Sequence, residues 1–246
     1  MLALPESPLL IHRQPGWWEL RLNRESHRNA LDRASRTALA DALAEASAQS
    51  VRVLLLTGSG TAFCAGLDWK ERAADIASGA ADTAGPQAVA LNLALRGFAG
   101  VTIAAVNGAA IGGGLTLVNA CDLALAASDA VFSCPEIRSG GYASMAGPTS
   151  QMRLPPKRAA WLLLAGEPLD AATAEAWGLV NQVLPPAGLL PRARELAARL
   201  AGYDPAALIE TKASLARSPG GADAWHDALA NGQAVAAAIR SRRAAA

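Results

Sequence analysis

Two glycine-rich patterns each follow an apolar run and could bring backbone groups to a ligand. Residues 112–114 (GGG) follow the run 101–106 (VTIAAV), and residues 58–60 (GSG) follow 51–57 (VRVLLLT). Glycines let backbone N–H groups approach a ligand closely, and at a helix N-terminus those groups favour negative charge. A tight strand-to-helix turn explains the triplet equally well. The GSG pattern lacks the third glycine of a dinucleotide-binding fingerprint, because that position is Phe63, and no helix start follows it.

Two side chains further along could act on a substrate directly. Glu136 follows a short strand-like run, where a carboxylate can serve as a general base, although a lone glutamate is more often a solvated turn residue. Ser144 lies in GYASM (141–145), which resembles the nucleophile turn of the serine protease ClpP. That chemistry needs a histidine base within reach. The chain has three histidines, none between Ser144 and the expected C-terminal helices: His12, His27 and His226.

Composition excludes several classes of protein. The 246 residues include 22 Lys+Arg and 21 Asp+Glu, a formal net charge of +1, which argues against a nucleic-acid partner held by a broad basic field. Three cysteines without C-x-x-C spacing (Cys64, Cys121, Cys134) argue against a disulfide scaffold or a structural zinc site, and we expect no metal. With 52% hydrophobic and 17% charged residues the chain is expected to be ordered. Its length suits one α/β domain or two small ones.

One apolar stretch, residues 101–118, could be mistaken for a membrane span. It contains Asn107, Thr116 and four glycines, so a continuous helix of about 20 apolar residues is disfavoured. A buried strand, a glycine turn and a helix start explain it better. The N-terminal segment lacks the basic start and long apolar region of a signal peptide. We therefore expect a soluble, cytoplasmic protein with no membrane partner.

The hydrophobic pattern predicts strand–helix alternation followed by a helical tail. Residues 8–14 and 16–23 suggest a hairpin, and Asp32 is expected to cap a helix that runs to Gln49. Buried strands are expected at 51–57, 101–108, 122–128 and 130–133. From Pro155 onward the pattern is almost wholly helical, near 157–165, 170–177, 191–201, 204–216 and 222–241. The pattern favours a layered α/β core with a helical appendage that packs against partner subunits. Residues 70–90 show no assignable pattern.

Five segments also carry motifs that occur in the same order in one known family. They are LNRESHRNALD (22–32), LLLTGSGTAFCAGLDWKE (54–71), AAVNGAAIGGGLTLVNACDLALAA (104–127), FSCPEI (132–137) and LLLAGEPLDAATAEAWGLVNQVLPP (162–186). Together they resemble the crotonase (enoyl-CoA hydratase/isomerase) superfamily over essentially the whole chain. The resemblance implies an α/β fold built as a right-handed spiral of ββα units. It also implies an acyl-CoA-binding core over residues 1–190 and a C-terminal helical region over 191–246 used in homotrimers or dimers of trimers.

The same resemblance assigns roles to individual positions. Its members bind acyl-CoA thioesters, and the two backbone N–H groups that polarise the thioester carbonyl fall on Leu67 and Gly113, forming an oxyanion hole. Contacts to substrate or coenzyme A fall on Arg28, Ala30, Ala65, Asp68, Trp69, Lys70 and Ser144. Trp69, Ile76 and Tyr142 are candidates for the acyl pocket. No separate cofactor is expected, because coenzyme A is part of the substrate.

One carboxylate of the family pattern is missing. Family hydratases usually use two glutamates, and the first of these falls on Thr116, a poor base at neutral pH, while the second is retained as Glu136. This indicates Glu136 as the single acid/base, with Thr116 at most orienting water or substrate, in double-bond isomerisation or a specialised hydration. A catalytically weak acyl-CoA-binding member is an alternative. Decarboxylase or thioesterase chemistry on the same site is another.

Overall fold

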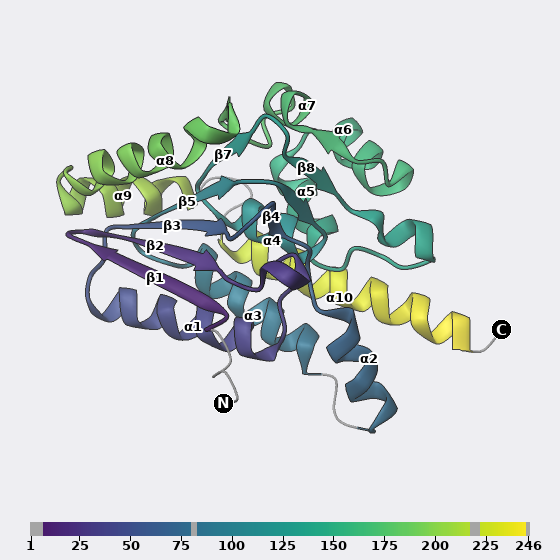
Figure 1. The fold of residues 1–246 in the computed structure, drawn as a ribbon. Coiled ribbons are helices and arrows are strands. Elements are labelled where there is room, and N and C mark those ends of the chain that lie inside the picture. Colours follow the sequence, from purple (N-terminus) through teal and green to yellow (C-terminus); the bar gives the residue numbers. More distant parts are fainter. Residues whose placement is uncertain (1–6, 80–82, 217–221, 245–246) are drawn as a thin grey trace.

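The computed structural model describes residues 7–79, 83–216 and 222–244, which form two β-sheets surrounded by helices (Figure 1). The larger sheet has the strand order β1-β2-β3-β5-β7-β10, and the smaller one β4-β6-β8-β9. The strands of the larger sheet are β1 (Leu9–Gln14), β2 (Trp17–Leu22), β3 (Val53–Gly58), β5 (Val101–Val106), β7 (Leu123–Ala127) and β10 (Gln182–Leu184). The strands of the smaller sheet are β4 (Ala62–Cys64), β6 (Ala109–Ile111), β8 (Val131–Ser133) and β9 (Leu169–Asp170).

Ten α-helices lie in the part of the chain that the structure describes. They are α1 (Arg33–Ala48), α2 (Trp69–Ala77), α3 (Ala84–Arg96), α4 (Gly113–Ala120), α5 (Ala146–Arg153), α6 (Pro156–Ala160), α7 (Ala171–Ala176), α8 (Pro186–Ala201), α9 (Pro205–Ala216) and α10 (Ala222–Ala244). A 3₁₀ helix covers Pro135–Ser139, and one π-helical turn covers Trp161–Ala165 directly after α6. None of these helices has the length and apolar character needed to cross a bilayer.

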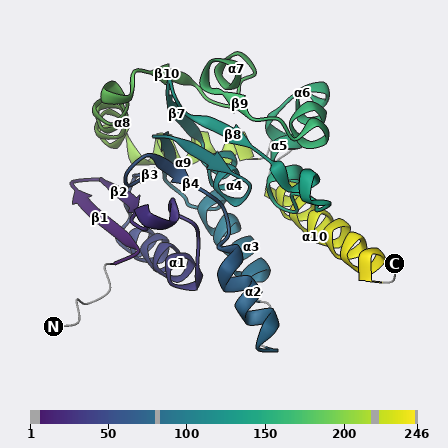
Figure 2. The same ribbon diagram turned by 45° about the vertical axis from the view of Figure 1, so that its right-hand side comes forward.

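Five of the six strands of the larger sheet form where the sequence predicts them, and β10 was not predicted. Strands β1 and β2 pair as an antiparallel hairpin, and β2, β3, β5, β7 and β10 run parallel. Every residue of β3 is buried, as expected of a strand covered on both faces. Helix α1 packs against β1 and β2, while α8 packs against β3, β5 and β7 (Figure 2). The Asp32 side chain accepts a hydrogen bond from the Ser35 N–H and caps α1, which confirms the predicted helix start.

Most strands of the smaller sheet were not predicted from the sequence. Strand β8 agrees with the predicted strand at 130–133, but β4, β6 and β9 were not predicted. Strands β4, β6 and β8 are three residues each and run parallel, and β9 pairs with β8 antiparallel. Strands β3–β4, β5–β6 and β7–β8 each place one strand in each sheet before the chain turns into helix. This repetition is the predicted spiral of ββα units, and it confirms the fold class.

Several predicted boundaries change in the structure. The unassigned residues 70–90 include α2 and the start of α3, and helix α5 lies before the predicted helical tail. The tail contains the short strands β9 and β10, so the expectation of an almost wholly helical segment after Pro155 is wrong. Helix α8 begins at Pro186 instead of 191, because Pro191 is accommodated inside the helix. It therefore crosses the boundary predicted between residues 190 and 191, and the division into two units stays a prediction.

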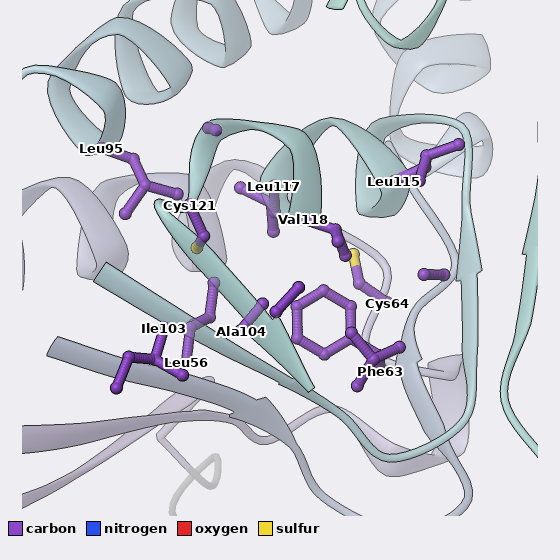
Figure 3. Close-up of a cluster of buried hydrophobic side chains, with 14 of the residues drawn as sticks. Leu56, Phe63, Cys64, Leu95, Ile103, Ala104, Leu115, Leu117, Val118 and Cys121 are labelled. Carbon is purple, nitrogen blue, oxygen red and sulfur yellow. The ribbon is translucent and has the colours of Figure 1, made fainter. Parts of the chain in front are cut away.

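Helix α4 fixes the position of the smaller sheet against the larger one. Figure 3 shows its side chains Leu117 and Val118 directed towards Ile103 and Ala104 of β5. Cys64 of β4 lies in the same cluster, and all five of these residues are buried. The end of α4 that begins at Gly113 is thus held by packing, which positions the backbone around the glycine triplet.

Candidate active site

The ends of three parallel strands meet at one edge of the smaller sheet. Residues 65–67 follow β4, residues 112–113 follow β6, and residues 135–136 follow β8. Ile111 pairs with Ser133, and the Gly112 N–H donates to the Ser133 carbonyl at 2.9 Å, which continues the pairing to the edge. Ligands of open α/β sheets commonly bind outside the carboxyl ends of parallel strands. Three segments far apart in sequence are thereby gathered at one place.

The backbone N–H groups of Leu67 and Gly113 lie close together at this edge. A β-carbon built on Gly113 would lie 3.3 Å from the Leu67 nitrogen, so the two segments approach closely. Gly66 has φ +95°, and a β-carbon there would lie 2.8 Å from the Ile111 carbonyl oxygen, so only glycine fits. Among the described residues neither N–H has a hydrogen-bond acceptor. The pair predicted as oxyanion donors is thus close together and available to a ligand.

The carboxylate of Glu136 lies beside these N–H groups. Gly112 has φ +51°, and a β-carbon at that position would lie 2.6 Å from Glu136 Oε1, so glycine leaves room for the carboxylate. The Oε2 atom is buried and has no hydrogen-bond partner within the described parts of the chain. Burial raises the pKa of Glu136, an effect partly offset by a hydrogen bond with its own backbone. A half-buried carboxyl with one unpartnered oxygen can both accept and return a proton.

A cavity of about 600 Å³ contains this edge. Six predicted site residues line it: Ala65, Leu67, Trp69, Gly113, Glu136 and Ser144. Tyr142, a predicted acyl-pocket candidate, also lines it, whereas Ile76 does not and is 64% exposed on α2. The volume lies within the range of pockets that bind small molecules or cofactors.

A smaller cavity of about 210 Å³ adjoins the first and shares Ala65, Leu67 and Trp69 with it. The other predicted contact residues line this cavity: Arg28, Ala30, Asp68 and Lys70. Arg28 is exposed, and Lys70 lies over the Trp69 ring at 5.9 Å. Two exposed cationic side chains beside an opening suit an anionic group.

Asp68 has a structural function in this smaller cavity. Its carboxylate accepts hydrogen bonds from the Lys70 and Glu71 N–H groups and caps α2, and it pairs with Arg24 at 3.0 Å. Burial acts to raise its pKa, but the bonds from Arg24 and the backbone outweigh burial and lower it. Asp68 therefore stays ionised and holds the start of α2 next to Trp69.

Thr116 lines neither cavity. Its side chain is buried, and Oγ1 donates to the Gly112 carbonyl one helical turn earlier, at 3.2 Å. Its own carbonyl accepts from Asn92, whose side chain also accepts from Trp225 of α10. The structure therefore shows the Thr116 hydroxyl engaged in the start of α4, and its predicted catalytic role stays a prediction.

Ser144 is attached to the C-terminal helix. The Gln233 amide of α10 donates to Ser144 Oγ at 3.3 Å, and a β-carbon on Gly232 would clash with the Ser144 carbonyl. The partner of this hydroxyl is an amide and not the histidine base that the hydrolase hypothesis requires. Helix α10 thus supports one wall of the larger cavity.

Other residues of the larger cavity were not singled out in the sequence. They are Gly66, Arg72, Ile111, Arg138, Ser139 and Ala146. Gly66 lies between the predicted residues Ala65 and Leu67, and Ile111 precedes the glycine triplet, so proximity in the chain was the available signal for these two. Arg72 lies one helical turn after the cap of α2, in the segment that showed no assignable pattern.

The sequence and the fold are similar to those of known proteins. A family model described as enoyl-CoA hydratase/isomerase matches residues 13–230. The chain is 37% identical over 215 residues to 2,3-dehydroadipyl-CoA hydratase of Escherichia coli (strain K12), covering 86% of this chain and 83% of that protein. An enoyl-CoA hydratase/isomerase from Xanthobacter autotrophicus Py2 superposes with a TM-score of 0.86 at 28% identity, covering 95% and 87%. A monofunctional enoyl-CoA isomerase from M. smegmatis superposes with a TM-score of 0.70 at 31% identity, covering 85% and 92%.

Proposed function

Because the chain belongs to the enoyl-CoA hydratase/isomerase family, we propose that it moves a double bond in an enoyl-CoA thioester, with Glu136 as the single acid/base. The observation that carries this proposal is the set of residues that line the larger cavity. Among the described residues that line it, Glu136 is the one carboxylate, and it lies beside the N–H groups of Leu67 and Gly113. A single base next to two N–H donors suits transfer of one proton within the substrate.

In this proposal the thioester carbonyl oxygen accepts hydrogen bonds from Leu67 and Gly113. Negative charge grows on that oxygen when a proton leaves the neighbouring carbon, and fixed N–H donors stabilise it without reorganising. The N–H of Gly113 stands at the start of α4, where the helix dipole also favours negative charge.

Glu136 takes the proton from C2 of a 3-enoyl thioester, and the electrons of the C–H bond enter a conjugated dienolate. The resulting carboxylic acid returns the same proton to C4, and the double bond forms between C2 and C3. No water and no cofactor beyond the coenzyme A of the substrate enter this balance. The unpartnered Oε2 atom supports the assignment, because this oxygen is not committed to a structural hydrogen bond among the described residues.

The proposal is tested by incubating purified protein with 3-enoyl-CoA and following 2-enoyl-CoA by chromatography and mass spectrometry. We expect conversion by the wild type and loss of conversion by Glu136→Gln, which keeps the shape of the side chain but cannot accept the proton. Full activity of Glu136→Gln would contradict the mechanism. Tight binding of many CoA esters without any turnover would instead indicate a binding protein that has lost catalysis.

Hydration is the second candidate, because several relatives carry hydratase names, including the 2,3-dehydroadipyl-CoA hydratase. Two-carboxylate hydration is disfavoured here because Thr116 replaces one carboxylate and directs its hydroxyl to Gly112. Thr116→Glu tests whether the missing carboxylate is the obstacle, with Thr116→Gln as a matched control. A gain of hydration in the glutamate variant alone would support a site that lacks only this group.

We further propose that Arg28 and Lys70 bind phosphate groups of coenzyme A, and that the chain forms a homotrimer or a dimer of trimers. Helix α9 supports the assembly proposal, because none of its residues is buried and Ile209 and Leu215 are 42% and 68% exposed. Large exposed apolar groups of this kind commonly mark subunit contacts. Light scattering on purified protein tests it: a monomeric mass at micromolar concentration would contradict the proposal.

A further inference from the structure

A second cavity of about 420 Å³ lies beside the reaction cavity and has a different chemical character. Its walls are mainly aliphatic side chains of α6 and the π-helical turn, including Ala159, Ala160, Leu163 and Leu164. No charged side chain of the described residues lines it. The reaction cavity, in contrast, contains Arg72, Arg138 and Glu136.

The two cavities share one residue, Tyr142, and one wall. Cys134 and Ile137 line the apolar cavity, while Pro135 and Glu136 between them line the reaction cavity. The segment that carries the base therefore separates the two spaces, and a group held at Glu136 lies close to both. The Tyr142 side chain lines both cavities, so a long acyl group that reaches from one cavity into the other would run alongside it.

The position of Tyr142 is set by α5. Its hydroxyl hydrogen-bonds with Gln151, and a β-carbon on Gly147 would lie 2.8 Å from that hydroxyl. The polar end of the ring is thus attached to protein, while the ring itself faces the cavities. Burial raises the pKa of the nearby Cys134 thiol, which keeps that group neutral as well.

The rim of the apolar cavity exposes large hydrophobic groups. Leu164 is 74% exposed and Ile137 is 43% exposed. Apolar surface at the mouth of a cavity gains stability when an apolar ligand covers it. A terminal carboxylate inside the cavity would lose hydration, because among the described residues the lining offers the polar groups of Gln151 and Tyr142 but no cation, and the nearby Arg138 lines the reaction cavity instead.

We propose that this cavity binds the distal part of the acyl group, so that the substrates are CoA thioesters with an uncharged apolar tail that extends past Tyr142. The inference rests on the proposed function for the placement of the thioester at Glu136. The inference adds the class of acyl group that the protein takes. Apolar tails are accepted, and tails that end in a carboxylate are excluded.

Equilibrium binding of saturated acyl-CoA esters by calorimetry tests this without requiring turnover. Each buried methylene contributes about 0.8 kcal/mol, roughly fourfold in affinity, so octanoyl-CoA should bind at least about tenfold more tightly than butyryl-CoA. Hexanoyl-CoA should bind at least about tenfold more tightly than adipyl-CoA, because the adipyl carboxylate would be buried without a cationic partner. Equal affinities within either pair would overturn the proposal.

Ala160→Phe fills the apolar cavity and should lower octanoyl-CoA affinity to that of butyryl-CoA. Lys157→Phe adds the same ring at an exposed position of α6 and is the matched control. Leu164→Ala, at the exposed rim, gives a second variant with little risk to folding and should weaken octanoyl-CoA at least threefold. Wild-type octanoyl affinity in both test variants, or a changed oligomeric mass with unchanged affinity, would show that the cavity serves another purpose. Failure of 3-enoyl-CoA conversion would count against the proposed reaction only, since these binding measurements stand without it.

Discussion

The two sheets of this protein have different functions: the larger one contributes to stability, and the smaller one positions the groups that do chemistry. Five of the six strands of the larger sheet have five or six residues, β3 is buried along its whole length, and α1 and α8 pack against the sheet. The smaller sheet has strands of two or three residues, yet the segments that leave β4, β6 and β8 bring Leu67, Gly113 and Glu136 together. Each ββα unit contributes one strand to each sheet, so the rigid layer fixes the strand ends that carry the site. The reactive groups are therefore positioned by the larger sheet, whose own residues take no part in the reaction.

This division predicts that substitutions in the two sheets have opposite consequences. Changes at the ends of the short strands should affect catalysis more than folding, and changes in the larger sheet should do the reverse. The following variants test the comparison, beginning with the largest effect expected.

Glu136→Gln should lower kcat by about 10³-fold or more, since it removes the single base of the proposed reaction. The midpoint of thermal unfolding should fall little or rise, because the substitution removes a carboxyl whose Oε2 is buried without a partner. Kinetics and thermal unfolding on the same preparation measure both. A large loss of stability would mean that Glu136 supports the fold as much as the chemistry.

Leu55→Ala, in the middle of β3, should lower the free energy of unfolding by about 2–5 kcal/mol. Leu55 is fully buried, so the substitution leaves a cavity in the core. Activity per folded molecule should stay near that of the wild type at temperatures where the variant is folded. Leu10→Ala, at a residue of β1 that is 37% exposed, is the control and should change stability by less than about 0.5 kcal/mol.

Gly66→Ala should lower kcat about 10²-fold, by displacing the Leu67 N–H from the carbonyl that it would bind. The added methyl group would press against the Ile111 carbonyl and force the loop to move. Gly178→Ala is the matched control, because Gly178 has φ +80° and open space around it. If both variants lose activity equally, backbone strain and not the N–H position would be responsible.

Arg28→Ala should raise KM for CoA esters about tenfold while leaving kcat nearly unchanged, since a charged hydrogen bond to phosphate is lost. Esters of pantetheine, which lack those phosphates, should show no such difference. Arg13→Ala, on β1 and paired with Glu45, is the control. An equal loss with both kinds of ester would place Arg28 elsewhere in the mechanism.

The pH dependence of kcat/KM tests the ionisation state of Glu136. Burial raises the pKa of Glu136, so its ionised form, which accepts the proton, is lost as pH falls through that raised value. Below it, kcat/KM should fall about tenfold per pH unit.

A carboxyl whose pKa is raised by folding stabilises the native state at low pH, and this contribution disappears as pH rises. The free energy of unfolding of Glu136→Gln should therefore lack this dependence on pH. Identical pH profiles of unfolding for the variant and the wild type would contradict the assignment.

Long, strongly patterned elements could be predicted from the sequence, and most short ones, β8 excepted, could not. Strands β3 and β5 are continuous apolar runs, and Asp32 marks the start of α1, so local pattern is sufficient for them. Strands β4 and β6 have three residues each and form because neighbouring strands pair with them, which no local pattern records. Family motifs predicted Leu67, Gly113 and Glu136, and the three lie at one cavity. The engagement of Thr116 with Gly112, the attachment of Ser144 to Gln233 and the apolar cavity beyond Tyr142 depend on tertiary contacts.

Hydrogen exchange at C2 of a saturated thioester tests the central claim most directly, because it reports enolate formation whether the natural reaction is isomerisation or hydration. Butyryl-CoA is incubated with the protein in D₂O, and its mass is followed over time. The account predicts deuterium uptake at C2 with the wild type and only the uncatalysed rate with Glu136→Gln, although that variant still binds the ester. Uptake by Glu136→Gln at the wild-type rate, or no uptake by wild-type protein saturated with ester, would contradict it.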